Sequence, residues 1–343
     1  MKVLTIRCLL ALAVILLPLQ AARSEDWFQQ VSGKSRRAGL PVTLTSASAA
    51  RYDDDHDGWL DNQYHDHDAE DVRGGFFEEL FDPPGHRHFT RRGTPLVHLF
   101  IVEPAVLHQD FFLDYRIGNN VDGNTDEQEV EVELEWALTK RLGLIIEAPY
   151  LGINRVTDPN TSGFGDIAVA GRALLVDGDM FFLSGNLEVE IPTGDDERGL
   201  GRGEAAVAPT VTTWHDLGNW TALHTQFGTE IGLESGDTEL IYGLALTHSF
   251  QGPTLLHANQ HHAHNNTDDH GVVFPIGFTS LILEMSGAMG LSGDEAGQTF
   301  FELLPGIAYT PVERIELRFG VRFPLFKPTR RDTQYIFTIA RVL

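Results

Sequence analysis

A ten-residue stretch, EVEVELEWAL (Glu129 to Leu138), constrains the fold of this chain more than any other feature. Side chains of a β-strand point to opposite faces at every second residue, whereas a helix repeats at about 3.6 residues. A strand therefore places the glutamates on one face and the apolar side chains on the other. The apolar face must be shielded from water, either in the core of a soluble β-sandwich or against the lipid around a membrane barrel.

The same alternation recurs along the chain from Thr94 onward, in segments of about ten residues separated by Gly, Asn and Asp turns. We predict about twelve strands, an even number that allows an antiparallel bacterial barrel to close. They are Leu107–Gly118, Glu127–Leu138, Leu142–Tyr150, Gly165–Leu175, Met180–Ile191, Glu204–Trp214, Trp220–Gly232, Glu239–Phe250, Val272–Met285, Thr299–Tyr309, Arg314–Phe323 and Thr333–Leu343. A further apolar run, Leu96–Glu103, is separated from the first strand by Pro104 and is interpreted as a lead-in.

The beginning of the chain carries an export signal. Lys2 and Arg7 precede an apolar run from Cys8 to Leu19, and small residues follow at Ala22 and Ser24. This pattern predicts a Sec-type signal peptide of residues 1–22, cleaved after Ala22 or Ser24. The apolar run is too short to span a bilayer comfortably as a retained anchor.

Composition limits the partners and the chemistry. The formal charge of −24 argues against nucleic acid and favours association with cations. Cys8 is the only cysteine, so the mature chain has no thiol for a disulfide or a thiolate metal site. No later segment has eighteen uninterrupted apolar residues, so any membrane crossing uses strands.

Three features together favour a membrane barrel over a soluble secreted β-protein: the export signal, the long strands, and a charged face that recurs in distant strands. The predicted fold class is all-β, a closed antiparallel transmembrane barrel of about 12 strands with an irregular N-terminal extension. Residues 23–93 form that extension, acidic and His-containing, partly disordered or plug-like, and residues 94–343 form the barrel. The predicted location is the bacterial outer membrane.

The charged faces predict which residues line the lumen. They are Glu129, Glu131, Glu133, Glu135, Glu188, Glu190, Glu316, Arg318 and Arg322, with Arg172 as a further candidate. A lumen with both charge signs indicates a narrow or plugged passage, because unpaired like charges in a tight space repel each other.

Several segments, in sequence order, resemble the outer-membrane barrel family named for the MetA pathway of phenol degradation. They are Gly163–Gly171 running into Arg172–Leu175, Glu188–Asp195, Gly199–Gly203 and Phe319–Leu325. The resemblance covers about Thr94 to Leu343. It implies a bacterial outer-membrane barrel related to channels for hydrophobic small molecules, and it implies no catalytic residues. The chain departs from the usual outer-membrane pattern at its end, where Leu343 replaces a terminal aromatic residue.

An acidic segment in the extension matches the start of a calcium-binding loop. Asp53, Asp55, Asp57 and Asp61 are spaced to wrap oxygen ligands around Ca2+, with Gly58 at the sharp turn. Tyr64 stands where a bidentate glutamate belongs, so the predicted affinity is weak. A solvated acidic linker is the alternative interpretation.

Histidines gather between His257 and His270, where His261, His262 and His264 lie close together. Imidazole favours zinc, copper or nickel, so this segment is a candidate transition-metal site, and a hydrophilic loop without metal is the alternative. The segment connects two predicted strands, and its length predicts a position on the outer side of the membrane.

These observations predict a passive outer-membrane channel or transporter for a small solute, either a hydrophobic organic compound or a metal ion. The alternative is a non-conducting or plugged barrel that binds metal through its Asp-rich and His-rich segments. No nucleophile elbow, phosphate loop or HExxH motif is present, so we expect no enzyme, although a hydrolase built on a barrel stays open because its Ser and His need not be adjacent in sequence. Expected partners are outer-membrane lipid, the barrel-assembly machinery and the cargo, and the sequence does not fix an oligomeric state.

Overall fold

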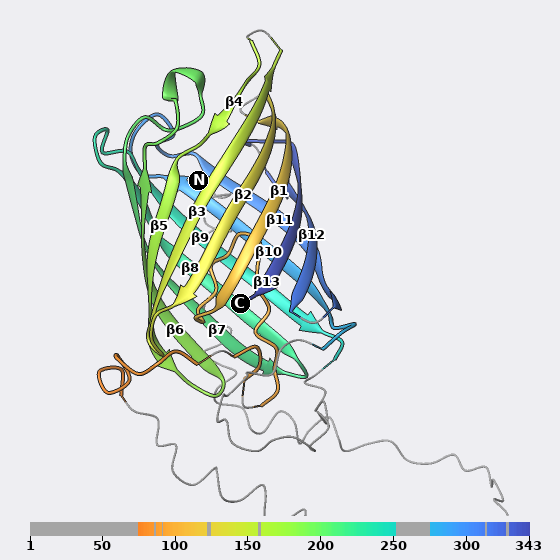
Figure 1. Cartoon of the computed structure of the whole chain (residues 1–343). Helices are drawn as coiled ribbons and strands as arrows, with labels where there is room; N and C mark the ends of the chain where they lie inside the picture. Colours follow the sequence, from red (N-terminus) through yellow and green to blue (C-terminus); the bar gives the residue numbers. More distant parts are fainter. Residues whose placement is uncertain are drawn as a thin grey trace, which may run out of the picture. The chain divides into compact units, whose positions relative to one another are not determined.

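The computed structural model describes residues 75–85, 87–90, 92–121, 125–156, 159–251, 275–312, 314–326 and 329–343. Within these ranges the chain forms thirteen strands and one short 3-10 helix (Figure 1). The strands are β1 (Gln109–Val121), β2 (Thr125–Ala137), β3 (Leu142–Arg155), β4 (Thr161–Phe164), β5 (Ile167–Asp177), β6 (Phe181–Ile191), β7 (Ala206–Gly218), β8 (Thr221–Gly232), β9 (Thr238–Ser249), β10 (Thr279–Gly290), β11 (Thr299–Val312), β12 (Ile315–Pro324) and β13 (Thr333–Val342), with the helix η1 (Asp196–Arg198) between β6 and β7. No helix in the described ranges is long and apolar enough to cross a membrane.

The strands close into a single antiparallel barrel. Apart from β4 and β5, neighbours in sequence pair with each other, and β1 pairs with β13, so the sheet closes on itself. Both β4 and β5 pair with β3, at its two ends, and together they fill one position in the wall. The wall is therefore twelve strands around, which confirms the predicted fold class.

The predicted strands correspond to those of the structure with several shifts in boundary, and the short strand β4 was not predicted. β3 continues to Arg155, beyond the predicted end at Tyr150, and β10 ends at Gly290 rather than at Met285. The strand predicted from Val272 begins at Thr279 instead. Proline donates no ladder hydrogen bond, and Pro275 precedes Gly277, whose φ of 85° lies outside the strand region. These two residues turn the chain before β10 starts.

The stretch EVEVELEWAL lies in β2 with its two faces in very different surroundings. Glu131 and Glu135 are 7% and 3% exposed, whereas Val132 and Trp136 on the opposite face are 39% and 46% exposed. The outward apolar face continues around the wall at Leu113, Leu187, Val211, Phe227, Leu246, Leu281, Leu283, Ile307, Leu317, Phe337 and Ile339. A soluble monomer rarely exposes so large an apolar surface, so this is a barrel of the outer-membrane type.

The two ends of the barrel differ in the length of their connections. Residues 138–141, 178–180 and 219–220 make short turns at one end, whereas residues 192–205, 291–298 and 325–332 make longer connections at the other. Outer-membrane barrels place short turns in the periplasm and longer loops outside. The end at which β1 begins and β13 ends is therefore the periplasmic end.

The His-rich segment lies between β9 and β10. β9 ends at the same end of the barrel as β5 and β7, which carry short turns. Residues 252–274 lie outside the described residues, so the outer position expected for the His-rich segment remains a prediction.

The segment of residues 94–108, which we call the lumen plug, lies inside the barrel rather than in its wall. Figure 1 shows it as part of the orange trace that precedes β1. Leu96, Val97 and Val102 are each 2% exposed. One part of the plug packs against Phe182 and Trp214, and another packs against inward side chains of β9 to β13. The run Leu96–Glu103, interpreted from sequence as a lead-in, thus fills the lumen.

Glycines in the wall make room for the apolar side chains of the plug. A Cβ added to Gly243 on β9 would lie 2.7 Å from Cγ2 of Val102, and one added to Gly306 on β11 would overlap the ring of Phe100. With Val102 and Phe100 in place, a larger residue at either position would displace the plug or distort the wall. The wall and the plug are therefore complementary in shape.

Candidate functional site: the lumen plug and its seat

The tip of the plug is held by one carboxylate of the wall. Glu284, on the inward face of β10, accepts the backbone N–H groups of Phe100, Ile101 and Val102 at 2.6, 2.9 and 2.9 Å. Glu284 is 1% exposed. An unpaired buried N–H is costly, so one carboxylate that satisfies three consecutive donors fixes the conformation of the turn.

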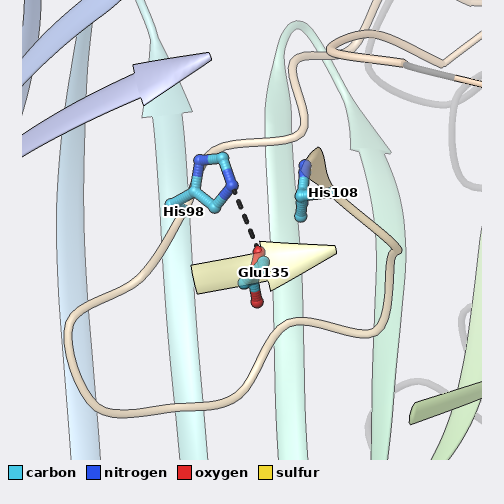
Figure 2. A group of neighbouring side chains, drawn as sticks. All are labelled: His98, His108 and Glu135. Atoms are coloured by element: carbon cyan, nitrogen blue, oxygen red, sulfur yellow. Dashed lines mark ion pairs between the residues drawn. The ribbon is translucent and has the colours of Figure 1, made fainter. Parts of the chain in front are cut away.

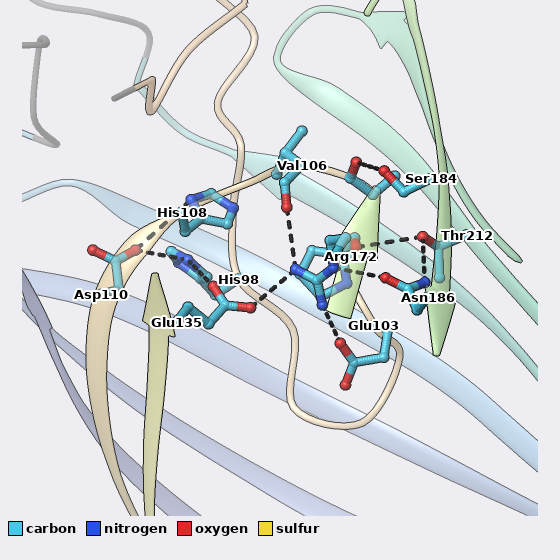
Figure 3. A network of polar contacts seen from close by, with 12 residues as sticks. His98, Glu103, Val106, His108, Asp110, Glu135, Arg172, Ser184, Asn186 and Thr212 are labelled. Atoms are coloured by element: carbon cyan, nitrogen blue, oxygen red, sulfur yellow. Dashed lines mark hydrogen bonds and ion pairs between the residues drawn. The ribbon is translucent and has the colours of Figure 1, made fainter. Parts of the chain in front are cut away.

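Arg172 on β5 holds the returning half of the plug. Its guanidinium donates to the carbonyl oxygen of Val106 at 3.1 Å and to Glu135 of β2 at 3.0 Å, and it pairs with Glu103 (Figure 3). Asn186 accepts from its Nε at 2.8 Å. One buried cation therefore joins the plug to two strands of the wall.

Smaller contacts complete this side of the seat. The hydroxyl of Ser184 on β6 donates to the carbonyl oxygen of Ala105 at 2.5 Å, and that of Thr212 on β7 donates to the carbonyl of Pro104 at 3.4 Å (Figure 3). These wall side chains satisfy backbone acceptors of a segment that has no strand partner in the wall. The plug is thus bound by side chains rather than by a β-ladder.

Arg318 on β12 holds the opposite side of the plug. Its guanidinium donates to the carbonyl oxygen of Leu99 and lies 5.4 Å from the ring centre of Phe100 and 4.9 Å from that of Phe112. Cation–π contacts of this kind are strengthened where water is excluded. Glu316, at 3.8 Å, is its carboxylate neighbour.

Two histidines of the plug meet two carboxylates of the wall near the periplasmic ends of β1 and β2. The Nε2 atom of His98 lies 2.9 Å from Oδ2 of Asp110 and 3.8 Å from Oε2 of Glu135, and Nδ1 of His108 lies 3.7 Å from Oδ2 of Asp110. Figure 2 shows the side chains of His98 and Glu135 pointing toward each other, with His108 beside them. Burial lowers the pKa of His98 to about 4, against the opposing effect of the carboxylates of Glu135 and Glu316, so its imidazole is neutral at neutral pH.

Toward the outer end, the lumen is lined mainly by carboxylates. In the strand register Glu133 of β2 is opposite Glu147 of β3, on the inward face. Arg116 pairs with Glu129 at 2.5 Å and with Glu131 at 2.7 Å. Such carboxylates attract cations into the passage.

All nine predicted lumen residues lie at inward positions of the strand register. Glu131, Glu135, Glu316 and Arg318 are buried, and Glu129, Glu133, Glu188, Glu190 and Arg322 are half-buried. The structure pairs Arg322 with Glu302 and places Glu190 3.8 Å from Arg202. Charge pairing across the lumen therefore includes partners that the sequence did not identify.

The predicted metal segments fall outside the described residues. This applies to Asp53, Asp55, Asp57 and Asp61 of the calcium-like loop and to His261, His262, His264 and His270 of the His-rich segment. Both remain predictions.

Sequence reasoning missed the residues that hold the plug. Glu284 is the only charged residue in the run SLILEMSGAMG of β10, and His98 interrupts the apolar run LVHLFIV. A charged or polar residue inside an apolar run was the signal that could have identified them, because such a group requires a partner when it is buried. The sequence could not show that Glu284 has its partners in the plug and that His98 has its partners in the wall.

Comparison with known families agrees with this architecture. The family model described as "Putative MetA-pathway of phenol degradation" matches residues 130–280, from β2 to the start of β10. The family resemblance is confirmed. No curated protein sequence matches the chain.

Solved outer-membrane barrels are similar to this chain at low identity. An outer-membrane channel from Pseudomonas putida F1 is 14% identical, with a TM-score of 0.49 over 72% of this chain and 100% of that chain. The NanC porin is 12% identical, with a TM-score of 0.43 over 68% and 99%. The KdgM porin, solved with disordered oligogalacturonate, is 9% identical, with a TM-score of 0.42 over 68% and 99%.

Proposed function

We propose that this protein is a passive outer-membrane channel for a small cationic solute, and that the lumen plug moves when the solute passes. One observation carries the proposal. The plug occupies the lumen but contributes no strand to the wall, and side chains such as Glu284 and Arg172 hold it. It can therefore leave its seat without breaking the β-ladder that closes the barrel.

The lining supports a cationic cargo more than a hydrophobic one. Glu131, Glu133, Glu147 and Glu188 face the lumen, and Arg116 neutralises only part of their charge. A hydrophobic compound would have to strip water from these carboxylates, whereas a metal ion or organic cation is attracted by them. Hydrophobic organic compounds, which the family resemblance implied, are the second cargo class.

The proposed setting follows from the same features. The signal peptide would direct Sec-type export, the barrel-assembly machinery would insert the strands, and the apolar outer face would contact lipid. In this setting the channel carries out no catalysis. Both ends of the plug would lie toward the periplasm.

The alternative is a plugged barrel that does not conduct. The many contacts that hold the plug favour it, because each must be lost before the lumen opens. In this alternative the predicted Asp-rich and His-rich segments would hold metal ions without transport.

Conductance in planar bilayers tests the proposal. Refolded protein should give discrete current steps, with a reversal potential in a KCl gradient that indicates cation preference. Inserted protein that gives no steps, either as the native chain or after Glu284→Ala, would support the non-conducting alternative. A preference for anions would contradict the proposed cationic cargo but would still support a channel.

A further inference from the structure

We propose that His98, His108, Asp110 and Glu135 form a binding site for a divalent transition metal, with zinc as the best match, and that the bound ion fastens the lumen plug to the wall. This site is distinct from the Asp-rich and His-rich segments predicted from the sequence. Two ligands belong to the plug, while Asp110 belongs to β1 and Glu135 to β2.

The spacing of the ligand atoms fits a small coordination sphere. One atom each of His98, His108 and Glu135 lie within 4.8 Å of one another. Ligands about 2.0–2.1 Å from a tetrahedral zinc ion lie roughly 3.3 Å apart. The separations of 2.9 Å between His98 and Asp110, 3.7 Å between His108 and Asp110, and 3.8 Å between His98 and Glu135 lie close to that value.

The buried charge around the plug calls for a cation. Four carboxylates of this region are buried, and two guanidiniums are buried with them: Asp110, Glu135, Glu284 and Glu316 against Arg172 and Arg318. When all are ionised, the region carries an excess of two negative charges away from water. A divalent ion beside Asp110 and Glu135 would balance that excess, and burial of an unbalanced charge is costly.

A small space adjoins the cluster. A cavity of about 40 Å³ is lined by His98, Glu133, Glu135, Arg318 and neighbouring plug residues. A space of this size can hold a water molecule or an ion. His98 and Glu135 therefore have room beside them for an ion.

The donor types select among ions. Imidazole nitrogens favour zinc, nickel and copper, whereas calcium and magnesium prefer sites built from oxygen ligands alone. Two imidazoles and two carboxylates match a four-coordinate zinc site. Calcium is thus a suitable negative control in any binding measurement.

The placement of the ligands gives the ion a mechanical role. His98 lies near the start of the plug and His108 at its end, so one ion would tie both ends to the barrel near its periplasmic end. The plug between them carries the tip held by Glu284. Closure by the ion rests on the proposed channel function, whereas binding of the ion does not.

The binding test uses a chain in which Asp53, Asp55, Asp57 and Asp61 and His261, His262, His264 and His270 are replaced by alanine, so that neither predicted metal segment contributes. Zinc titration by calorimetry, with metal analysis after dialysis, should show one zinc ion retained per chain. The same measurement with calcium should show no retained ion. His98→Ala with His108→Ala should abolish the retained equivalent. Glu135→Gln should lower the affinity for zinc by at least about 10- to 100-fold, which is the loss that changes in the outer coordination shell cause.

Two controls separate ligand loss from misfolding. His224→Ala removes another buried imidazole of the lumen, on β8, and should leave zinc binding unchanged. Cobalt(II) provides a spectroscopic signature, because a four-coordinate site gives intense visible absorption that Glu135→Gln should alter. Zinc retained equally by the double histidine variant, or no zinc retained by the starting chain, would overturn the proposal.

A second arm tests closure separately. Zinc should lower the open probability of the starting chain and have no effect on the double histidine variant. If zinc binds but does not change the open probability of an active channel, the fastening role is wrong and the zinc site still stands. A silent channel that still binds zinc through these residues would reject the channel function and keep the site.

Discussion

Replacing Glu284 with alanine removes the acceptor of three plug N–H groups in a buried place. Hydrogen bonds to a charged group contribute about 1.5–3 kcal/mol each, and bonds that share one carboxylate are not additive. Three such bonds at 2.6–2.9 Å therefore stabilise the seated plug by about 3–4 kcal/mol in total. That free energy corresponds to a change of roughly two to three orders of magnitude in the ratio of open to closed channels.

Single-channel recording of Glu284→Ala in planar bilayers measures that ratio. The matched control is Glu190→Ala, because Glu190 also faces the lumen but pairs with Arg202 rather than with the plug. Glu284→Ala should increase the open probability strongly, and Glu190→Ala should not. Equal open probabilities in the two variants, with both inserted as folded barrels, would refute the role assigned to Glu284.

Three further predictions concern the plug, the wall and the lining. Gly306→Val should displace the ring of Phe100 and increase protease cleavage within the plug while the barrel still migrates as a folded species in gels; unchanged cleavage would contradict the packing. Val132→Arg should place a charge against lipid at a cost of about 2–4 kcal/mol near the midplane and reduce refolding into vesicles, whereas Val132→Leu should refold normally. Glu188→Gln with Glu190→Gln should shift the reversal potential in a KCl gradient toward zero, and an unshifted potential would exclude these carboxylates from selectivity.

The wall was predictable from the sequence because each strand carries its own signal. The period-two pattern of EVEVELEWAL predicts a strand and shows which side chains share each face, and the turn residues mark where strands end. The same local rules explain the main error in a boundary, since Pro275 and Gly277 delay β10 and were available in the sequence. The family resemblance agreed with this reasoning without being needed for it.

The site was only partly predictable because it depends on contacts between distant segments. Glu135, Arg318 and Arg172 were identified as lumen residues, but their partners in the plug were not. An apolar run such as LVHLFIV is equally compatible with a strand and with a buried segment, and periodicity alone cannot distinguish them. The His-rich segment lies outside the described residues, so the side of the membrane predicted for it remains a prediction.

A reversible disulfide between the plug and the wall tests whether the plug must move before the channel conducts. In a chain with Cys8→Ser, Val102→Cys and Gly243→Cys can be joined, because a Cβ at position 243 would lie 3.5 Å from Cβ of Val102, within the range of a disulfide. The oxidised protein should be silent in bilayers, and reduction should restore the current steps. Equal conductance before and after reduction, with the disulfide verified, would show that solutes pass without movement of the plug.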